Sequence, residues 1–295
     1  MEAPPPEAEV VGIVGGFEKF VAVVASPKYE ILGDDMQVLS IKLDLAEEVT
    51  TAPGSLNFMH PGIHSSVDCK DCFGRCMSGE RCIMATYKAT SPDAYVALAS
   101  DVPGKVIPVH LGDVDGKIRT KTGAFFASLG DARLTFHFDC NPCTCCFAGQ
   151  GLLHQVIVGS SSSTAFLSAM GTILTKRLDD GEVLVVDTHS LVAWQDSVKL
   201  GIRRTGGCCT CCCAGEGLFN TTLTGPGHIF LQSMSKEKFK AALSVAAANN
   251  QRRGGGGSAA SGSPLAPDDS YMTYAANSGA SAPPDAHYMT YREAP

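Results

Sequence analysis

Long apolar runs and clusters of basic residues are both missing from this chain of 295 residues. A helix that spans a bilayer needs about 20 predominantly apolar residues, and no stretch of the sequence reaches that length. The net charge is -7, and without grouped Lys and Arg we expect no nucleic-acid partner. The first residues have neither a basic n-region nor an Arg-rich pattern, so we predict no secretory signal and no transit peptide.

Charged residues are also scarce, at 18% of the chain, while 44% of the residues are hydrophobic. The sequence contains 31 glycines and 16 prolines and few long helical patterns, which favours short strands joined by many turns. We therefore predict an all-β fold. No nucleophile, base and orienting group occur together in a recognisable pattern, so we do not expect an enzyme.

Cysteine, in contrast, is abundant, with 13 residues. The odd count and the missing secretory signal favour reduced thiols in the cytoplasm over a disulfide framework. Twelve of these cysteines fall into three clusters: Cys69, Cys72 and Cys76; Cys140, Cys143, Cys145 and Cys146; and Cys208, Cys209, Cys211, Cys212 and Cys213.

The clusters belong to an internal repeat of about 70 residues that occurs three times. Its landmarks are Leu56, Phe125 and Leu191, each following a short turn. Cys76, Cys146 and Cys212 each stand three residues ahead of an equivalent glycine: Gly79, Gly149 and Gly215. The spacing predicts that the three clusters occupy the same turn of each repeat and that a pseudo-threefold arrangement gathers them at one end of the molecule.

The repeats define the predicted domain organisation. A disordered lead (1–9) precedes a β domain (10–235) whose repeats cover about 36–103, 104–172 and 173–233. Ser235 is a suitable N-cap for an amphipathic helix over 235–251, with Phe239, Ala242 and Leu243 on the stripe expected to dock on the β domain. A disordered tail (254–295) follows, in which a YMTY block occurs twice and suggests a protein-docking motif: Tyr271, Tyr274, Tyr288 and Tyr291.

Several of these segments resemble the altered-inheritance-of-mitochondria protein 24 family, formerly a domain of unknown function. The resemblance covers roughly residues 37–235 and depends on the following segments together: Pro53-Gly54-Ser55-Leu56, Gly123-Ala124-Phe125-Phe126-Ala127-Ser128, Gly215-Glu216-Gly217-Leu218-Phe219, Gly225-Pro226-Gly227 and Leu231-Gln232-Ser233. It implies an all-β double-stranded β-helix or sandwich like that of the tryptophan-RNA-binding attenuator superfamily. It also implies trimeric relatives, no known enzymatic activity, and a link of mitochondrial members to inner-membrane organisation.

Three interpretations of the cysteine clusters remain open. The thiols could fill tight turns as small buried residues, since free cysteine often does so. They could be acceptors for S-acylation, because several lipid chains together attach a protein firmly to a bilayer. They could also bind zinc or copper or take part in redox chemistry, since Cys69-x-x-Cys72 and Cys140-x-x-Cys143 have a spacing that suits a tetrahedral ion.

Together these observations predict a non-enzymatic scaffold or membrane-organising β protein with a cysteine-rich face. We expect a homo-oligomer, with a trimer as one form, that is cytoplasmic and associated with a membrane surface; the resemblance offers mitochondria as the alternative. The other reading is a thiol-based metal or redox-binding protein. His60 and His64 lack a carboxylate at useful spacing, so we interpret them as residues of a solvated loop and not as a metal site.

Overall fold

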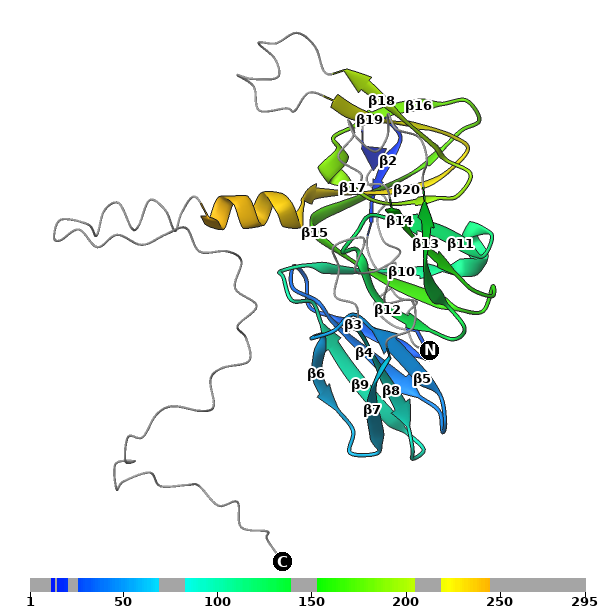
Figure 1. The fold of residues 1–295 in the computed structure, drawn as a ribbon, viewed down its shortest axis with the longest axis vertical. Helices are drawn as coiled ribbons and strands as arrows, with labels where there is room; N and C mark the ends of the chain where they lie inside the picture. The colour runs from blue at the N-terminus through cyan, green and yellow to red at the C-terminus, as the bar shows by residue number, and fades with distance from the viewer. Residues whose placement is uncertain are drawn as a thin grey trace, which may run out of the picture. The chain divides into compact units, whose positions relative to one another are not determined.

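The computed structural model describes residues 12–13, 15–20, 26–68, 83–138, 153–204 and 219–244. This part of the chain consists of antiparallel strands, two short 3-10 turns and a single helix that follows the last strand (Figure 1). The all-β prediction is therefore confirmed, together with the C-terminal helix. The predicted disordered lead and tail lie outside the described residues.

The first repeat begins after three N-terminal strands: β1 (Gly12–Ile13), β2 (Phe17–Lys19) and β3 (Tyr29–Leu32). Its own strands are β4 (Val38–Leu43), β5 (Glu48–Thr51), β6 (Leu56–Met59), β7 (Ile63–Asp68), β8 (Met84–Ala89) and β9 (Ala94–Ala99). Alternation of buried and exposed side chains in β3 and β4 explains why these segments form strands with one face on a core.

The second repeat contains β10 (Lys105–His110), the 3-10 turn η1 (Leu111–Val114), β11 (Lys117–Thr120), β12 (Phe125–Leu129), β13 (Arg133–Phe138), β14 (Leu153–Val158) and the first part of β15 (Thr164–Leu178). The third repeat shares the end of β15 and adds β16 (Val183–Val186), the 3-10 turn η2 (Thr188–Ser190), β17 (Leu191–Gln195), β18 (Lys199–Arg204), β19 (Phe219–Thr224) and β20 (Gly227–Met234). The long strand β15 thus joins the two repeats covalently and through hydrogen bonds.

The same four strand pairings occur in every repeat. In the first repeat β9 pairs with β4 and β6, while β8 pairs with β5 and β7. The second repeat has the equivalent pairs β15 with β10 and β12, and β14 with β11 and β13. In the third, β20 pairs with β15 and β17, and β19 pairs with β16 and β18.

A β-bulge marks the same position in each repeat. The landmarks Leu56, Phe125 and Leu191 begin β6, β12 and β17, and the register shifts directly after each of them. Each landmark also faces an equivalent leucine across the ladder: Leu98, Leu167 and Leu231. A bulge bends its strand and strengthens the local twist, so the turn that precedes each landmark has the same place in each repeat.

Neighbouring repeats are joined edge to edge. The edge strand β5 of the first repeat pairs with β12 of the second, and β11 of the second pairs with β17 of the third. Among the described residues the buried apolar side chains form three cores. The core of the first repeat contains Phe126 and Phe166 from the second repeat, and the core of the second contains Ala193 and Phe230 from the third. Each joint therefore also buries side chains of one repeat in the core of the preceding one.

The helix occupies residues 236–244 of the described chain. Ser235 caps it as predicted: the Lys238 N–H donates to Ser235 Oγ at 3.1 Å and the Phe239 N–H donates to the Ser235 carbonyl at 2.9 Å. The expected docking of the apolar stripe is wrong for its second half, since Ala242 is exposed and Leu243 is 55% exposed. The surface beneath the first turn is polar and holds it through charged contacts.

Candidate functional site

The residues that the sequence singled out as sites lie outside the part of the chain that the structure describes. This applies to the twelve clustered cysteines and to Tyr271, Tyr274, Tyr288 and Tyr291. The expectation that the clusters gather at one end of the molecule is therefore still a prediction. The strands on either side are described, and each cluster stands between two paired strands: β7 and β8, β13 and β14, or β18 and β19.

The two histidines of the first repeat are described. His60 Nδ1 accepts a hydrogen bond from the Gly62 N–H at 3.0 Å, and its ring lies 5.4 Å from the Tyr95 ring. His64 lies in strand β7, paired with Lys88, and not in a loop as expected. Within the described residues there is no group of three or more His, Cys, Asp or Glu placed to hold a metal ion.

Instead, the structure brings together the turns that precede the repeat landmarks. Pro53-Gly54-Ser55 of the first repeat and Thr122-Gly123 of the second line one cleft of about 350 Å³, and Lys236, Glu237 and Lys240 of the helix line it as well. A smaller hollow beside it also contacts Leu191 and Gln232 of the third repeat. Gly54 and Gly123 both have φ of 83°, in the left-handed region that favours glycine, so the two turns share one backbone shape.

Lys121 stands next to this cleft, where β11 ends. Its Nζ donates a hydrogen bond to the Thr188 carbonyl oxygen at 3.3 Å. Burial lowers the pKa of the Lys121 ammonium, an effect that nearby Glu237 and Asp187 oppose and Lys238 reinforces. Lys121 is thus a partly buried cation held between the helix and the turn η2.

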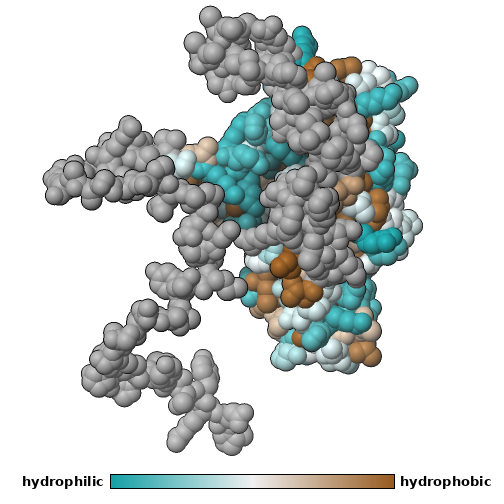
Figure 2. Space-filling model, viewed as in Figure 1, coloured by the Kyte–Doolittle hydropathy of each residue, from teal (hydrophilic) through white to brown (hydrophobic). Residues whose placement is uncertain are grey.

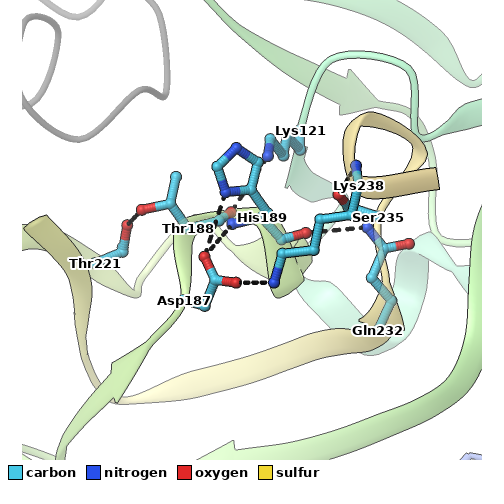
Figure 3. A network of polar contacts seen from close by, with 8 residues as sticks. All are labelled: Lys121, Asp187, Thr188, His189, Thr221, Gln232, Ser235 and Lys238. Atoms are coloured by element: carbon cyan, nitrogen blue, oxygen red, sulfur yellow. Dashed lines mark hydrogen bonds and ion pairs between the residues drawn. The ribbon is translucent and has the colours of Figure 1, made fainter. Parts of the chain in front are cut away.

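Asp187 organises the other side. It is the N-cap of η2, where its Oδ1 accepts from the His189 N–H at 3.0 Å, and its Oδ2 forms an ion pair with Lys238 of the helix (Figure 3). Burial alone would raise the pKa of the Asp187 carboxyl, but the bonds from Lys238 and His189 lower it below its usual value of 3.8. The carboxylate therefore links η2 to the first helical turn.

Hydrogen bonds between neutral groups complete the network. We call the whole network the helix seat; it consists of Lys121, Asp187, Thr188, His189, Thr221, Gln232, Ser235 and Lys238 (Figure 3). Gln232 of β20 donates to the His189 carbonyl at 3.2 Å and accepts from the Met170 N–H at 3.0 Å. Beneath them, the buried hydroxyls of Thr188 and Thr221 lie 2.8 Å apart. The seat ties strands β15, β19 and β20, the turn η2 and the helix together.

The chemistry of the seat is that of a structural anchor. Lys238 is paired with Asp187, Lys121 donates to a carbonyl oxygen, and at the margin of the seat Lys236 binds Asp101 of the first repeat at 2.9 Å. None of these residues belongs to a cysteine cluster or to a recognisable catalytic set, so no sequence motif pointed to them. The repeat nevertheless contains a signal, since Lys121 and Asp187 each directly follow the strand that precedes a landmark turn.

The Asp187 carboxylate should give the protein a pH-dependent share of its stability. Because its pKa is lower in the folded state, the contribution is present at neutral pH and is lost as the pH falls through and below 3.8. We expect Asp187→Asn to cost about 1 kcal/mol of unfolding free energy at neutral pH and progressively less as the pH falls below 3.8. Thermal melts from pH 7 to 3 measure this, with exposed Asp180→Asn as control; a cost that does not change with pH would contradict the assignment.

Fold and site together define a β architecture of three edge-joined repeats with a helix seated over their landmark turns. The chain belongs to the family described as mitochondrial biogenesis AIM24, whose sequence pattern matches residues 29–234. The resemblance drawn from the sequence is thereby confirmed.

Two bacterial proteins are similar to this chain. An uncharacterized protein of Streptococcus pyogenes serotype M6 is 30% identical over 170 residues, a match that covers 58% of this chain and 66% of the relative, just under two thirds of its length. A crystal structure of a protein from Streptococcus pyogenes superposes with a TM-score of 0.59 at 25% identity, covering 74% of this chain and 99% of the other. The likeness therefore extends over most of the β domain (10–235), which we call the β body.

Proposed function

We propose that this protein is a non-enzymatic scaffold that organises a membrane surface through its cysteine-bearing segments. The observation that carries the proposal is that three equivalent hairpins each lead into one cluster. The last described pairs before the clusters are Asp68 with Met84, Phe138 with Leu153 and Arg204 with Phe219. A protein that presents the same thiol-rich segment three times has several attachment points on one rigid body.

Several attachment points matter because one acyl chain binds a membrane only marginally and reversibly, whereas two or more hold it stably. No helix in the described part of the chain is long and apolar enough to cross a bilayer. In this proposal the clusters are acceptors for S-acyl groups, and the β body keeps them at fixed spacing along the membrane.

Acyl exchange on the full chain purified from membranes tests this directly. We expect hydroxylamine-sensitive label on the clustered cysteines, and a large loss of label when Cys208, Cys209, Cys211, Cys212 and Cys213 are replaced by serine. Cys82, which is outside the clusters, offers a matched control, since Cys82→Ser should leave the signal unchanged. A membrane-derived protein with no modified thiol would rule acylation out.

The alternative is a thiol-based zinc, copper or redox-binding protein. It is favoured by the two-residue gaps in Cys69-x-x-Cys72 and Cys140-x-x-Cys143, which let two thiolates reach one tetrahedral ion. Elemental analysis of the purified chain separates the two proposals: a stoichiometric metal with unmodified thiols would favour this one.

The remaining parts of the proposal concern assembly and location. A homo-oligomer, with a trimer as one form, suits a scaffold, and the likeness to the tryptophan-RNA-binding attenuator superfamily belongs to the same proposal. We place the protein in the cytoplasm on a membrane surface, with mitochondria as the alternative. The YMTY blocks would recruit a protein partner, and deleting residues 260–295 should abolish that interaction while leaving the β body folded.

A further inference from the structure

Two strand edges of the kind that joins repeats inside the chain have no neighbouring strand among the described residues. The first is β6, where Phe58 is 50% exposed and Met59 38% exposed. The second is β16, where Val183 is 59% exposed and Val185 39% exposed. Figure 2 shows brown, hydrophobic residues gathered over the first repeat, which contains β6. Both edges are therefore apolar as well as uncovered.

The internal joints show what normally covers such edges. The equivalents of β6 are β12 and β17, and each is paired with the β5-type strand of the preceding repeat. Every described side chain of β12 is buried, and Leu191, Val192, Ala193 and Trp194 of β17 are at most 1% exposed. The β5-type strand of the third repeat is β16, which lacks this partner.

We propose that β16 of one copy of this chain pairs antiparallel with β6 of a second copy, forming a joint of the same kind as the two inside the chain. At those joints Ala127 faces Thr51 and Ala193 faces Thr120. Carrying the register over by the repeat equivalence places Phe58 opposite Val186, Met59 opposite Val185 and His60 opposite Leu184. The proposed partner is thus a second copy of this chain, and the pairing assigns a partner residue to each position of the contact.

Side-chain sizes at the joint agree with this pairing. At the internal joints a small residue of the joining strand lies beside a large one: Ala127 pairs with Phe166, and Ala193 pairs with Phe230. In the first repeat the sizes are exchanged, since Phe58 pairs with Ala97. The summed volume is kept, so Phe58 can enter the core of the second copy's third repeat, as Ala127 enters the core of the first.

The two edges also lack the features by which proteins protect edge strands. Lysine, proline and inward-pointing charges commonly prevent edge-to-edge pairing, and neither Leu56–Met59 nor Val183–Val186 contains any of them. Three other edge strands behave differently: β7, β13 and β18 are equivalent to one another, and no joint between repeats uses them. The two joint-type edges are therefore set apart from ordinary sheet edges.

The edges lie at opposite ends of the row of repeats, with β6 in the first repeat and β16 beside β19 in the third (Figure 1). Such a contact is head-to-tail, which builds a closed ring if the rotation closes and a filament if it does not. The inference rests on the homo-oligomer proposed above and adds the surface that would form it. It does not depend on acylation or on a metal.

Charged substitutions at the predicted Met59–Val185 pair test the proposal on the full chain. Every joint between two copies contains Met59 of one copy and Val185 of the other, so Met59→Lys or Val185→Glu alone buries a charge that has no opposite charge beside it. We expect each single variant to raise the protein concentration at which half of the oligomer dissociates at least about tenfold. The double variant places Lys opposite Glu in every joint and should recover about two- to fivefold of that loss, a typical gain for a cross-strand ion pair.

Sedimentation velocity over a concentration series gives the readout, with circular dichroism to show that each variant is folded. Val67→Lys is the matched control, because Val67 is exposed on β7, an edge that no joint uses. An oligomer that resists both single variants would overturn the edge assignment and leave the homo-oligomer in place. Dissociation without recovery in the double variant would overturn the predicted register, and a wild type that is monomeric at every concentration would overturn both proposals.

Discussion

Replacing Trp194 with alanine is expected to lower the unfolding free energy by about 3–5 kcal/mol, as is usual when a large aromatic residue is removed from a core. Trp194 is fully buried, at 0% exposure, in the core of the third repeat, where it packs with Leu178, Val186 and Leu223. It also lies in β17, which pairs with β11 of the second repeat. The substitution therefore opens a cavity at the joint between two repeats.

Urea unfolding followed by circular dichroism measures this cost, because Trp194 is the sole tryptophan and fluorescence would vanish with it. Trp194→Phe keeps an aromatic ring at the site and should cost clearly less. A cost below about 1 kcal/mol for the alanine variant, the range of a surface substitution, would mean that this core is not packed as described.

Phe166→Ala should have an effect of similar size, about 3–5 kcal/mol, for a different reason. Phe166 belongs to β15 but packs in the core of the first repeat, where its ring lies 5.0 Å from Tyr29 in an edge-to-face contact. The next residue, Leu167, points into the core of the second repeat. Phe166 thus helps to hold the first and second repeats together.

Because the contact crosses a joint, we expect the alanine variant to loosen the first repeat selectively. Hydrogen exchange should speed up in β4 and β9 more than in β19. Phe166→Leu is the control, since it retains most of the apolar volume and should be milder. Uniform acceleration across all three repeats would show that they unfold as one cooperative unit.

Much of the fold could be predicted because equivalent residues recur at regular intervals along the sequence. Leu56, Phe125 and Leu191 are recognisable as landmarks in the sequence alone, and they begin equivalent strands that carry equivalent bulges. The capping role of Ser235 followed from residue type and position. These features depend on local chemistry and on a period that a single sequence displays.

The joints and the helix seat could not be predicted in the same way. Which edge strand pairs with which repeat depends on packing between residues far apart in the chain, such as Ala127 with Thr51. The seat depends on Lys121, Asp187 and Lys238 meeting from three elements, and none of them has an unusual sequence context. Periodicity predicts that Leu243 shares a helix face with Phe239, but it does not show whether another part of the protein covers that face.

The central claim is that the row of three repeats ends in two complementary strand edges, β6 and β16. The most direct test is to measure amide hydrogen exchange in these two strands as a function of protein concentration. At concentrations where the chain is assembled, the edge amides of both strands should exchange as slowly as those of β12 and β17, and Met59→Lys should restore fast exchange in both strands together. Fast exchange in β6 and β16 at every concentration, with β12 and β17 protected, would contradict it.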